Sequence, residues 1–526
     1  MTGGGALDAL ATGSAAIGSS GQAGAISILV LGGLVVLPVL LATRAARPAN
    51  PGHHRRPWVG HDALAMTGDF ISAAGFLGLT GLVALSGADA LLYCVGWLVA
   101  WPVAICLTGE PLRALGRRSF AGALAVRFPE NLVRLAAAPG IIAVVLFYLA
   151  AQLVGAGILA HLLFGVSYAT AIIAVGAAIA ACMVVGAVSA AAWVQAVKTG
   201  LLLFAVIVLA VMVLLHFSGN PLAVLAQAAA RFGDGVLAPS QLTTNPLEAF
   251  SLGLANAFGP AGLPHVVGRF TGTRDRRLAH RAVFFASGLI ATYYLAGLVV
   301  GFGTAAIAGR DAVMQLDPSG NAAALALAAA LTGGKLGALS LAAIIAIVGG
   351  LTLSGASALA HDLWIAVLRY GDSRDEDPTH ARLWTARLAT LAVVACAILL
   401  ALALRFQNID FLISLVFAIG ASAQLPALFL TIVWRGFTQA GAVASMLVGT
   451  AASLVVIYGS PTVQIGLLQH PRAWFPFDHP ALFAIPLALA AGVLASLVGR
   501  SKSAAIRFAR MHRQLVSGQN EPMPVE

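Results

Sequence analysis

Charge is what this sequence has least of: Asp, Glu, Lys and Arg make up 10% of the 526 residues, whereas 60% are hydrophobic. Soluble globular domains carry about 25% charged residues, and no interval between the apolar runs is long enough for a soluble domain. The composition therefore excludes a soluble enzyme and predicts a polytopic membrane protein. For such a chain we expect neither catalytic residues nor a redox cofactor.

Cysteine is also scarce, with four residues in the chain, and each of them lies inside an apolar run. We interpret Cys94, Cys106, Cys182 and Cys396 as small buried hydrophobic residues, which excludes a disulfide or metal framework. Residues 1–24 are rich in Gly, Ala and Ser and lack a basic segment, so we expect a flexible lead and not a cleavable signal peptide.

Long apolar runs dominate the rest of the chain. A helix needs about 20 apolar residues to cross a bilayer, and about thirteen such runs predict an all-α membrane protein. The runs lie near residues 25–43, 67–86, 89–108, 135–158, 167–187, 196–216, 247–267, 282–308, 336–359, 385–405, 411–433, 438–458 and 481–500.

Basic residues gather in alternate loops between these runs. With the N-terminus outside and the C-terminus in the cytoplasm, every basic cluster lies on the cytoplasmic side, as the positive-inside rule requires. The net charge of +10 is then a topology signal in an inner or plasma membrane, and not the footprint of a nucleic-acid-binding protein. The tail, residues 501–526, is basic and amphipathic, so we expect a surface helix against the lipid bilayer.

The span at 67–86 has an unusual composition for a lipid-facing helix. It contains an acid, Asp69, together with four glycines, at positions 68, 75, 78 and 81. A glycine costs about 1 kcal/mol against alanine in a helix interior, so the cluster predicts either a helix that breaks or close packing through small residues. A broken helix at membrane depth is tolerated only where its free backbone groups line a cavity or meet protein.

A second interrupted span follows five spans later and runs in the opposite direction. The run 247–267 contains Gly259-Pro260 and Pro264, and proline removes a helix hydrogen bond. Paired interruptions predict a 5+5 inverted repeat, 67–216 and 247–433, with substrate bound between the two discontinuous helices. The helix at 25–43 and two helices in 438–500 are then additions, although prolines also kink many transmembrane helices without functional consequence.

Several strings in the chain resemble one transporter family, over about residues 60–515. They are GDFISAAGFLG (68–78), YLAAQLVGAG (148–157), AGLPH (261–265) with Arg269-Phe270, GLTLSGASA (350–358) with His361-Asp362-Leu363, and Asn408-Ile409. The chain resembles the sodium:solute symporter family, and within it the acetate permease branch. The resemblance implies a LeuT-like fold, alternating access, and uptake of acetate or a similar short monocarboxylate with Na+ or H+.

Three alternatives to a monocarboxylate symporter are a symporter of a neutral solute, a metabolite sensor and a channel, and each would require different sequence features. A symporter of a neutral solute such as an amino acid would use the same fold, whereas a sugar needs more buried polar partners than the broken spans offer. A metabolite sensor derived from a transporter would need a signalling domain, and a channel would not need paired breaks. The oligomeric state, and whether a small membrane subunit binds, stay open.

The substrate carboxylate is expected at the two breaks. Neither broken span carries a mid-membrane Arg or Lys, so helix N-termini and hydroxyls would hold the anion, with the amides of Gln152 and Asn256 as helpers or as interhelical hydrogen-bonding groups. The expected substrate-binding residues are Gly75, Gly78, Thr80, Gln152, Asn256, Gly259 and Gly262.

For the coupling cation, oxygen ligands are expected. The resemblance implies backbone carbonyls near Gly68 and Ile71, together with hydroxyls on the ninth span. Asp69 is a further candidate as a cation ligand, a proton carrier or a helix cap. The available hydroxyls are Thr352, Ser354 and Ser357.

Two departures from the family pattern leave both Na+ and H+ open. Ala346 and Ile347 stand where relatives carry a hydroxyl pair, and Gln195 stands where many carry an acid. We interpret Lys198 as a side chain extending to the inner interface, and His265 as an interfacial structural residue.

Overall fold

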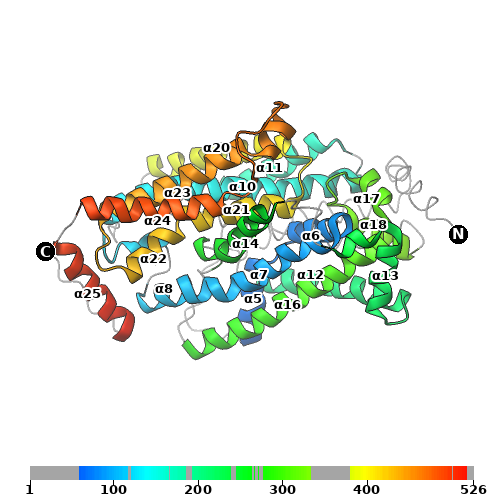
Figure 1. Cartoon of the computed structure of the whole chain (residues 1–526), viewed down its shortest axis with the longest axis horizontal. Helices are drawn as coiled ribbons and strands as arrows, with labels where there is room; N and C mark the ends of the chain where they lie inside the picture. Colours follow the sequence, from blue (N-terminus) through cyan, green and yellow to red (C-terminus); the bar gives the residue numbers. More distant parts are fainter. Residues whose placement is uncertain are drawn as a thin grey trace.

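The computed structural model describes residues 59–116, 120–164, 166–184, 192–238, 245–263, 266, 270–271, 276–332, 380–499 and 502–517. In this part of the chain all regular structure is helical (Figure 1), and seven helical runs are long and apolar enough to cross a membrane. The fold is thus an all-helical membrane protein. The runs expected at 25–43 and 336–359 lie outside the described residues.

The first half of the chain contributes the elements from α5 to α13. They are α5 (Val59–Phe70), α6 (Ala73–Ser86), η3 (Gly87–Ala90), α7 (Leu91–Ala104), η4 (Ile105–Gly109), α8 (Glu110–Ala114), α9 (Phe120–Leu124), α10 (Glu130–Phe164), α11 (Tyr168–Val184), α12 (Ala192–His216) and α13 (Pro221–Phe232).

The second half contributes a comparable set. Its main elements are α14 (Pro246–Phe258), η6 (Gly259–Gly262), α16 (Arg276–Ile307), α17 (Arg310–Leu316), α18 (Ala323–Thr332), α20 (His380–Ala403), α21 (Ile409–Ala423), α22 (Leu425–Val433), α23 (Gln439–Gly459), α24 (Ala481–Val498) and α25 (Lys502–Ser517).

The first expected break is present between α5 and α6. Helix α5 ends at Phe70 and α6 begins at Ala73, and Ser72 between them is extended with φ −137° and ψ 161°. The Gly75 N–H donates to Ser72 Oγ at 2.9 Å, so the serine caps α6. Asp69 stands in the last turn of α5, where the helix ends, so it does not cap the start of a helix, which was one of the three roles left open for it.

The second expected break is also present. Helix α14 ends at Phe258, the 3-10 turn η6 covers Gly259–Gly262, and Leu263 is extended with φ −100° and ψ 113°. Gly259-Pro260 therefore ends the regular helix, as the proline chemistry predicts. Pro264 and His265 lie outside the described residues.

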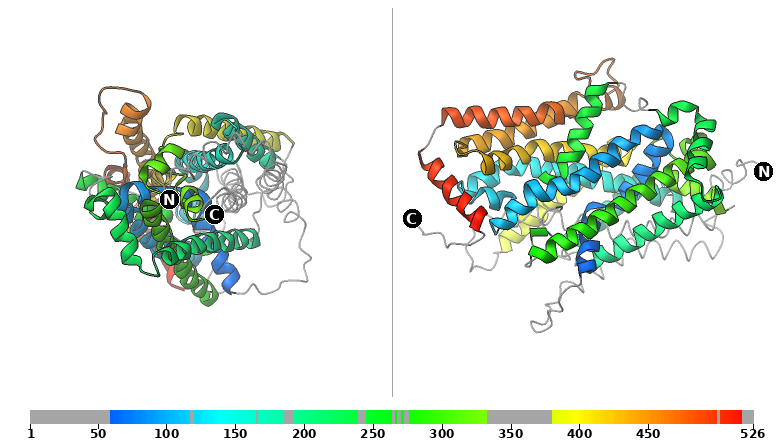
Figure 2. Two further views of the ribbon diagram at one scale, coloured as in Figure 1. Left: turned by 90° about the vertical axis from the view of Figure 1, so that its right-hand side faces the viewer. Right: turned by 60° about the horizontal axis from the view of Figure 1, so that its bottom comes forward.

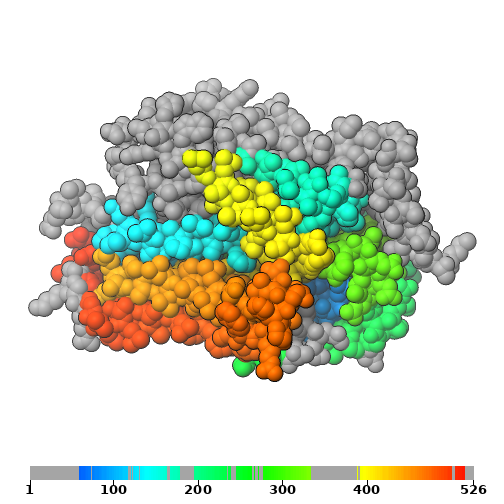
Figure 3. Space-filling view, turned by 90° about the horizontal axis from the view of Figure 1, so that it is seen from above, coloured from blue at the N-terminus to red at the C-terminus, as the bar shows by residue number. Residues whose placement is uncertain are grey.

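Helix α21 is the centre of the bundle. It packs against α10, α14, α23, α6 and η6, and most of the apolar run Ile409–Val433 is buried inside the protein. Around it, α20 lies across α10 and α11 on one face (Figure 3). On another side, α5 packs against α12 and α16 (Figure 2). Both helix breaks thus lie against one central helix.

The C-terminal tail forms α25 at one end of the bundle (Figure 1). Its Met511 is fully buried, so part of its apolar face packs on protein. Beside it, Arg127 is 1% exposed and donates to four carbonyls, one in the last turn of α22 and three in the connection from α22 to α23. These are Thr431 O at 2.7 Å, Trp434 O at 3.0 Å, Arg435 O at 2.7 Å and Phe437 O at 2.6 Å.

The same guanidinium lies over the Phe508 ring of α25, 5.0 Å from its centroid. Burial, and secondarily the nearby Arg507 guanidinium, lower the pKa of Arg127 to about 10. Arg127 therefore stays charged at neutral pH and ties α25 to the α22–α23 connection.

Candidate functional site

A buried lysine lies at the end of α5, next to the first break. The Lys198 ammonium of α12 donates to the Gly68 carbonyl, and the side chain is 3% exposed. The interpretation of Lys198 as an interfacial side chain was therefore wrong. The Lys198 ammonium is thus bound to one of the carbonyls that were expected to ligate a coupling cation. This position suits a positive charge, because the carbonyls at a helix C-terminus are the negative end of the helix dipole.

Neighbouring contacts fix α5 on α12. Thr199 Oγ1 donates to Leu64 O at 2.9 Å and to Gln195 O at 2.8 Å. A Cβ at Gly68 would lie 2.5 Å from Thr199 Oγ1 and 2.7 Å from Gln195 O. Gly68 thus allows the close approach that brings its carbonyl to Lys198.

The glycines at the two breaks all face filled space. A Cβ on Gly78 would lie 2.7 Å from the Asp410 nitrogen, one on Gly259 2.3 Å from Phe417 Cβ, and one on Gly262 2.1 Å from Gly420 O. Each of these neighbours belongs to α21, so the glycines allow both breaks to pack on that helix. Their contact with a substrate stays a prediction.

Thr80 is fully buried and is satisfied within its own helix. Its hydroxyl donates to Phe76 O at 2.9 Å and lies 3.1 Å from Leu77 O. Gly75 faces a more polar neighbourhood, since its Cβ position is 3.3 Å from Ser72 Oγ, 3.6 Å from Asp410 Oδ1 and 3.7 Å from the Tyr293 hydroxyl.

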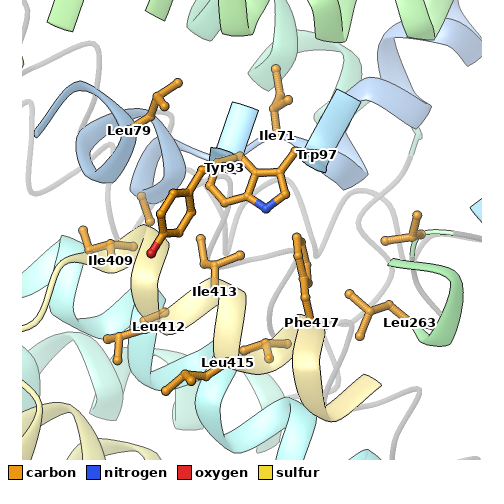
Figure 4. Packing of buried hydrophobic residues seen from close by; sticks show 14 of the residues in the cluster. Ile71, Leu79, Tyr93, Trp97, Leu263, Ile409, Leu412, Ile413, Leu415 and Phe417 are labelled. Carbon is orange, nitrogen blue, oxygen red and sulfur yellow. The ribbon is translucent and has the colours of Figure 1, made fainter. Parts of the chain in front are cut away.

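An aromatic and aliphatic group of side chains lies between α7 and α21. Figure 4 shows Trp97 of α7 facing Ile413 and Phe417 of α21, with its indole nitrogen directed toward α21. The Trp97 ring lies 6.3 Å from the Phe417 ring and 5.5 Å from the Tyr294 ring, between centroids. Ile71, at the first break, appears beside Trp97 in the same view.

Several polar side chains around α21 are buried without a hydrogen-bond partner among the described residues. They are the Trp97 indole N–H, the Gln152 amide nitrogen, both amide atoms of Asn256, and the Ser414 hydroxyl. Buried polar groups in native proteins are nearly always satisfied, so these groups are available to a bound polar molecule. Gln152 and Asn256 were expected from the sequence, whereas Trp97 was not.

Asp410, in the first turn of α21, was not predicted from the sequence. Its carboxyl is fully buried, and neither oxygen has a hydrogen-bond partner within the described ranges. Asn408 caps this turn by accepting from the Asp410 N–H at 2.8 Å and donates to Gly78 O at 3.1 Å. An acid at the start of an apolar run, one residue beyond the family string Asn408-Ile409, was the signal that could have found it.

The remaining expected residues divide into two sets. Asp69 lies in the last turn of α5, and Ile71 lies in the break itself and is buried. The three hydroxyl residues proposed for the cation lie outside the described residues; they are Thr352, Ser354 and Ser357.

Comparison with known proteins agrees with this architecture. The chain superposes with a TM-score of 0.63 on a Na+-coupled sialic acid symporter in a substrate-bound outward-open state, at 16% identity, over 90% of this chain and 97% of that one. It matches a mutant of the Eremococcus coleocola manganese transporter with a TM-score of 0.50, at 15% identity, over 90% and 98% of the two chains. At these identities the likeness shows the fold.

The family model identifies the chain more specifically. Residues 57–449 match the model of the sodium:solute symporter family, a region that contains both breaks, Lys198, Trp97 and Asp410. The protein is therefore a transporter and not an enzyme. It belongs to the sodium:solute symporter family.

Proposed function

We propose that this transporter imports acetate or a similar short monocarboxylate, together with Na+ or H+, by alternating access between two five-helix repeats. In this proposal it lies in the inner or plasma membrane, with its N-terminus outside and its C-terminus in the cytoplasm. The substrate binds between the breaks at Ile71-Ser72 and Gly259–Gly262.

The observation that carries the proposal is the Trp97 indole N–H, which is buried, has no hydrogen-bond partner among the described residues, and is directed toward α21 between apolar side chains. An N–H group donates well to a carboxylate, and the surrounding Ile413 and Phe417 suit a methyl or short alkyl group. The Gln152 amide is a second free donor on α10, the helix that packs against both α6 and α21. A small anion with an apolar end fits this combination.

The cation is proposed at the first break, near Gly68, Asp69 and Ile71, with hydroxyls from Thr352, Ser354 or Ser357. The family name supports Na+. The Lys198 ammonium on the Gly68 carbonyl competes with any cation at that oxygen, so a coupling ion bound there must use the other ligands or displace the lysine.

The direct test is uptake of labelled acetate into proteoliposomes, with a Na+ gradient and a proton gradient imposed separately. Uptake under either gradient is expected, with competition by propionate and none by a sugar. Trp97→Phe keeps the ring and removes the donor, so it should weaken acetate binding while leaving the fold intact. Folded protein that takes up no acetate under either gradient would overturn the monocarboxylate assignment and leave the symporter family alone.

An amino acid is the second candidate, because the free carboxyl of Asp410 would pair with a substrate ammonium group. The same vesicles loaded with labelled amino acids separate the two cases.

A further inference from the structure

We propose that Asp410 is a proton-binding site, and that packing of α6 against the start of α21 takes up one proton, which then travels with the substrate. This inference rests on the proposed symport and names a coupling group away from the Gly68 region. It places the proton at the contact between the first break and the central helix.

The contact between α6 and Asp410 is direct. The position that a Cβ would occupy on Gly78 is 2.8 Å from Asp410 Cγ and from Oδ1, and the equivalent position on Gly75 is 3.6 Å from Oδ1. Any larger side chain at Gly78 would displace the carboxyl. In this arrangement α6 therefore covers Asp410 and excludes water from it, since the residue has no exposed surface.

Nothing in the described part of the chain compensates a negative charge on this carboxyl. Neither oxygen has a hydrogen-bond partner, and the ion pairs found there do not include Asp410. An ionised carboxylate buried without a partner is far more costly than the neutral acid, and acids within membrane spans are functional by default. The packed arrangement therefore holds Asp410 as the carboxylic acid.

The titratable neighbours on the surrounding elements do not change this conclusion. On α14, Glu248 is already paired with His479 at 2.6 Å, and α6, η6, α22 and α24 carry no titratable residue. The neutral titratable residues on α7, α16, α10 and α23 are Tyr93, Cys94, Tyr293, Tyr294, Tyr148, His161 and Tyr458. The basic residues of α16 and α10 lie near the starts of these helices, at least 12 residues before Tyr293 on α16 and 21 before Gly155 on α10, which are the positions that lie near Asp410 and Ile409; they are Arg276, Arg277, His280, Arg281 and Arg134. At 1.5 Å per residue they are about 18 Å or more away along the helix, and none of them pairs with Asp410.

When α6 moves away, the situation reverses. A carboxyl reached by water is ionised at neutral pH, as an ordinary aspartate is. Separation of α6 from α21 thus releases the proton to the side that is open, and re-packing takes one up. Because only the packed state holds the proton, a proton gradient biases the conformational cycle.

Asp317 provides a matched control in the same region of the fold. It is also buried, but its carboxylate accepts from the Ser319 hydroxyl at 2.7 Å and from the Asn321 N–H at 2.7 Å. The Asn321 side-chain oxygen in turn accepts a hydrogen bond from the Ile409 N–H, so Asp317 lies close to the start of α21. Both oxygens of the Asp317 carboxyl thus have hydrogen-bond donors, whereas those of Asp410 have none among the described residues.

The first measurement is the infrared carbonyl band of a protonated carboxylic acid, recorded on reconstituted protein near neutral pH without substrate. The wild type should show the band, Asp410→Asn should lose it, and Asp317→Asn should keep it. Asp410→Glu should keep a band at shifted frequency, which covers the case in which the asparagine variant fails to fold. Absence of the band in the wild type, or its persistence in Asp410→Asn, would overturn the proposal.

The second measurement compares proton-driven accumulation with solute exchange at equal pH on both sides of the vesicle. Asp410→Asn should retain exchange but lose accumulation to the level of protein-free vesicles, whereas Asp317→Asn should keep both. Proton-driven accumulation by Asp410→Asn would contradict the proposal. If the wild type transports no monocarboxylate, the proposed function fails, while the infrared measurement still decides the protonation of Asp410.

Discussion

Gly262 offers a decisive comparison between two roles for the glycines at the breaks. In the structure, a Cβ at this position would lie 2.1 Å from Gly420 O and 2.6 Å from the Gly420 carbonyl carbon. Gly253, on α14 just before η6, has no described heavy atom outside its own helix within 4 Å of the same position. Both Gly262→Ala and Gly253→Ala therefore add one methyl group, the first where backbone atoms of α21 already fill the space and the second where the space is open.

The magnitude follows from these distances. A carbon normally approaches a carbonyl oxygen to about 3.3 Å, so η6 and α21 must separate by about 1 Å to admit the new methyl group. Both sides of the contact are backbone, which cannot rotate away, and overpacking of this kind costs about 1–3 kcal/mol. Gly253→Ala lies inside α14 and should instead stabilise the helix, by up to about 1 kcal/mol.

Thermal denaturation in detergent provides the assay, together with the KM for acetate uptake. We expect a lower denaturation midpoint for Gly262→Ala and an unchanged or higher one for Gly253→Ala. A Gly262→Ala protein with the wild-type midpoint but a raised KM would refute the packing argument. It would show that the bare backbone of Gly262 approaches the substrate, as predicted from the sequence.

Three further predictions test individual contacts. Lys198→Met frees the Gly68 carbonyl, so NaCl should raise the denaturation midpoint more in this variant than in the wild type, relative to choline chloride; an equal salt response would contradict it. Arg127→Met leaves the carbonyls that it binds unpaired, at a cost of about 3 kcal/mol, and should lower the denaturation midpoint more than Arg507→Met does. Trp97→Phe should raise the KM for acetate about tenfold or more, the value of one hydrogen bond to a charged group, and an unchanged KM would remove Trp97 from the site.

The two helix breaks could be predicted from the sequence because their causes are local. Proline at position 260 lacks the N–H that a helix needs, and Ser72 is a good cap for the helix that follows. Neither cause depends on the rest of the fold. The helical class follows in the same way from the length of the apolar runs.

What fills the space beside a glycine depends instead on tertiary structure. Nothing near Gly78, Gly259 or Gly262 in the sequence indicates that α21, about 150 to 340 residues later, packs against all three. The sequence supported substrate contact and helix packing equally. The structure supplies the neighbours on which packing depends.

Lys198 was misplaced for a related reason. Its position near the start of a predicted span, 196–216, suggested an interfacial side chain. The helix begins earlier, at Ala192, and α5 brings the Gly68 carbonyl beside it. The depth of a charged residue in the bundle depends on which backbone groups lie opposite, and periodicity does not report this.

A basic group and an acidic group thus lie on opposite sides of the first break. The Lys198 ammonium lies at the end of α5, and the Asp410 carboxyl lies beside the first turns of α6. The helix dipole favours both when charged, because α5 ends in free carbonyls and α6 begins with free N–H groups. For Lys198 the direct bond to Gly68 adds to this effect. For Asp410 the dipole supplies at most about 2 kcal/mol, whereas desolvating a carboxylate costs several, and no hydrogen bond makes up the difference within the described residues. The lysine therefore has a hydrogen-bond acceptor at its end of the break, whereas the acid at the other end has no partner among the described residues and is stable only with its proton. Movement of α6 changes the solvation of Asp410 directly, so the acid and not the lysine is the group through which the position of α6 is coupled to a proton.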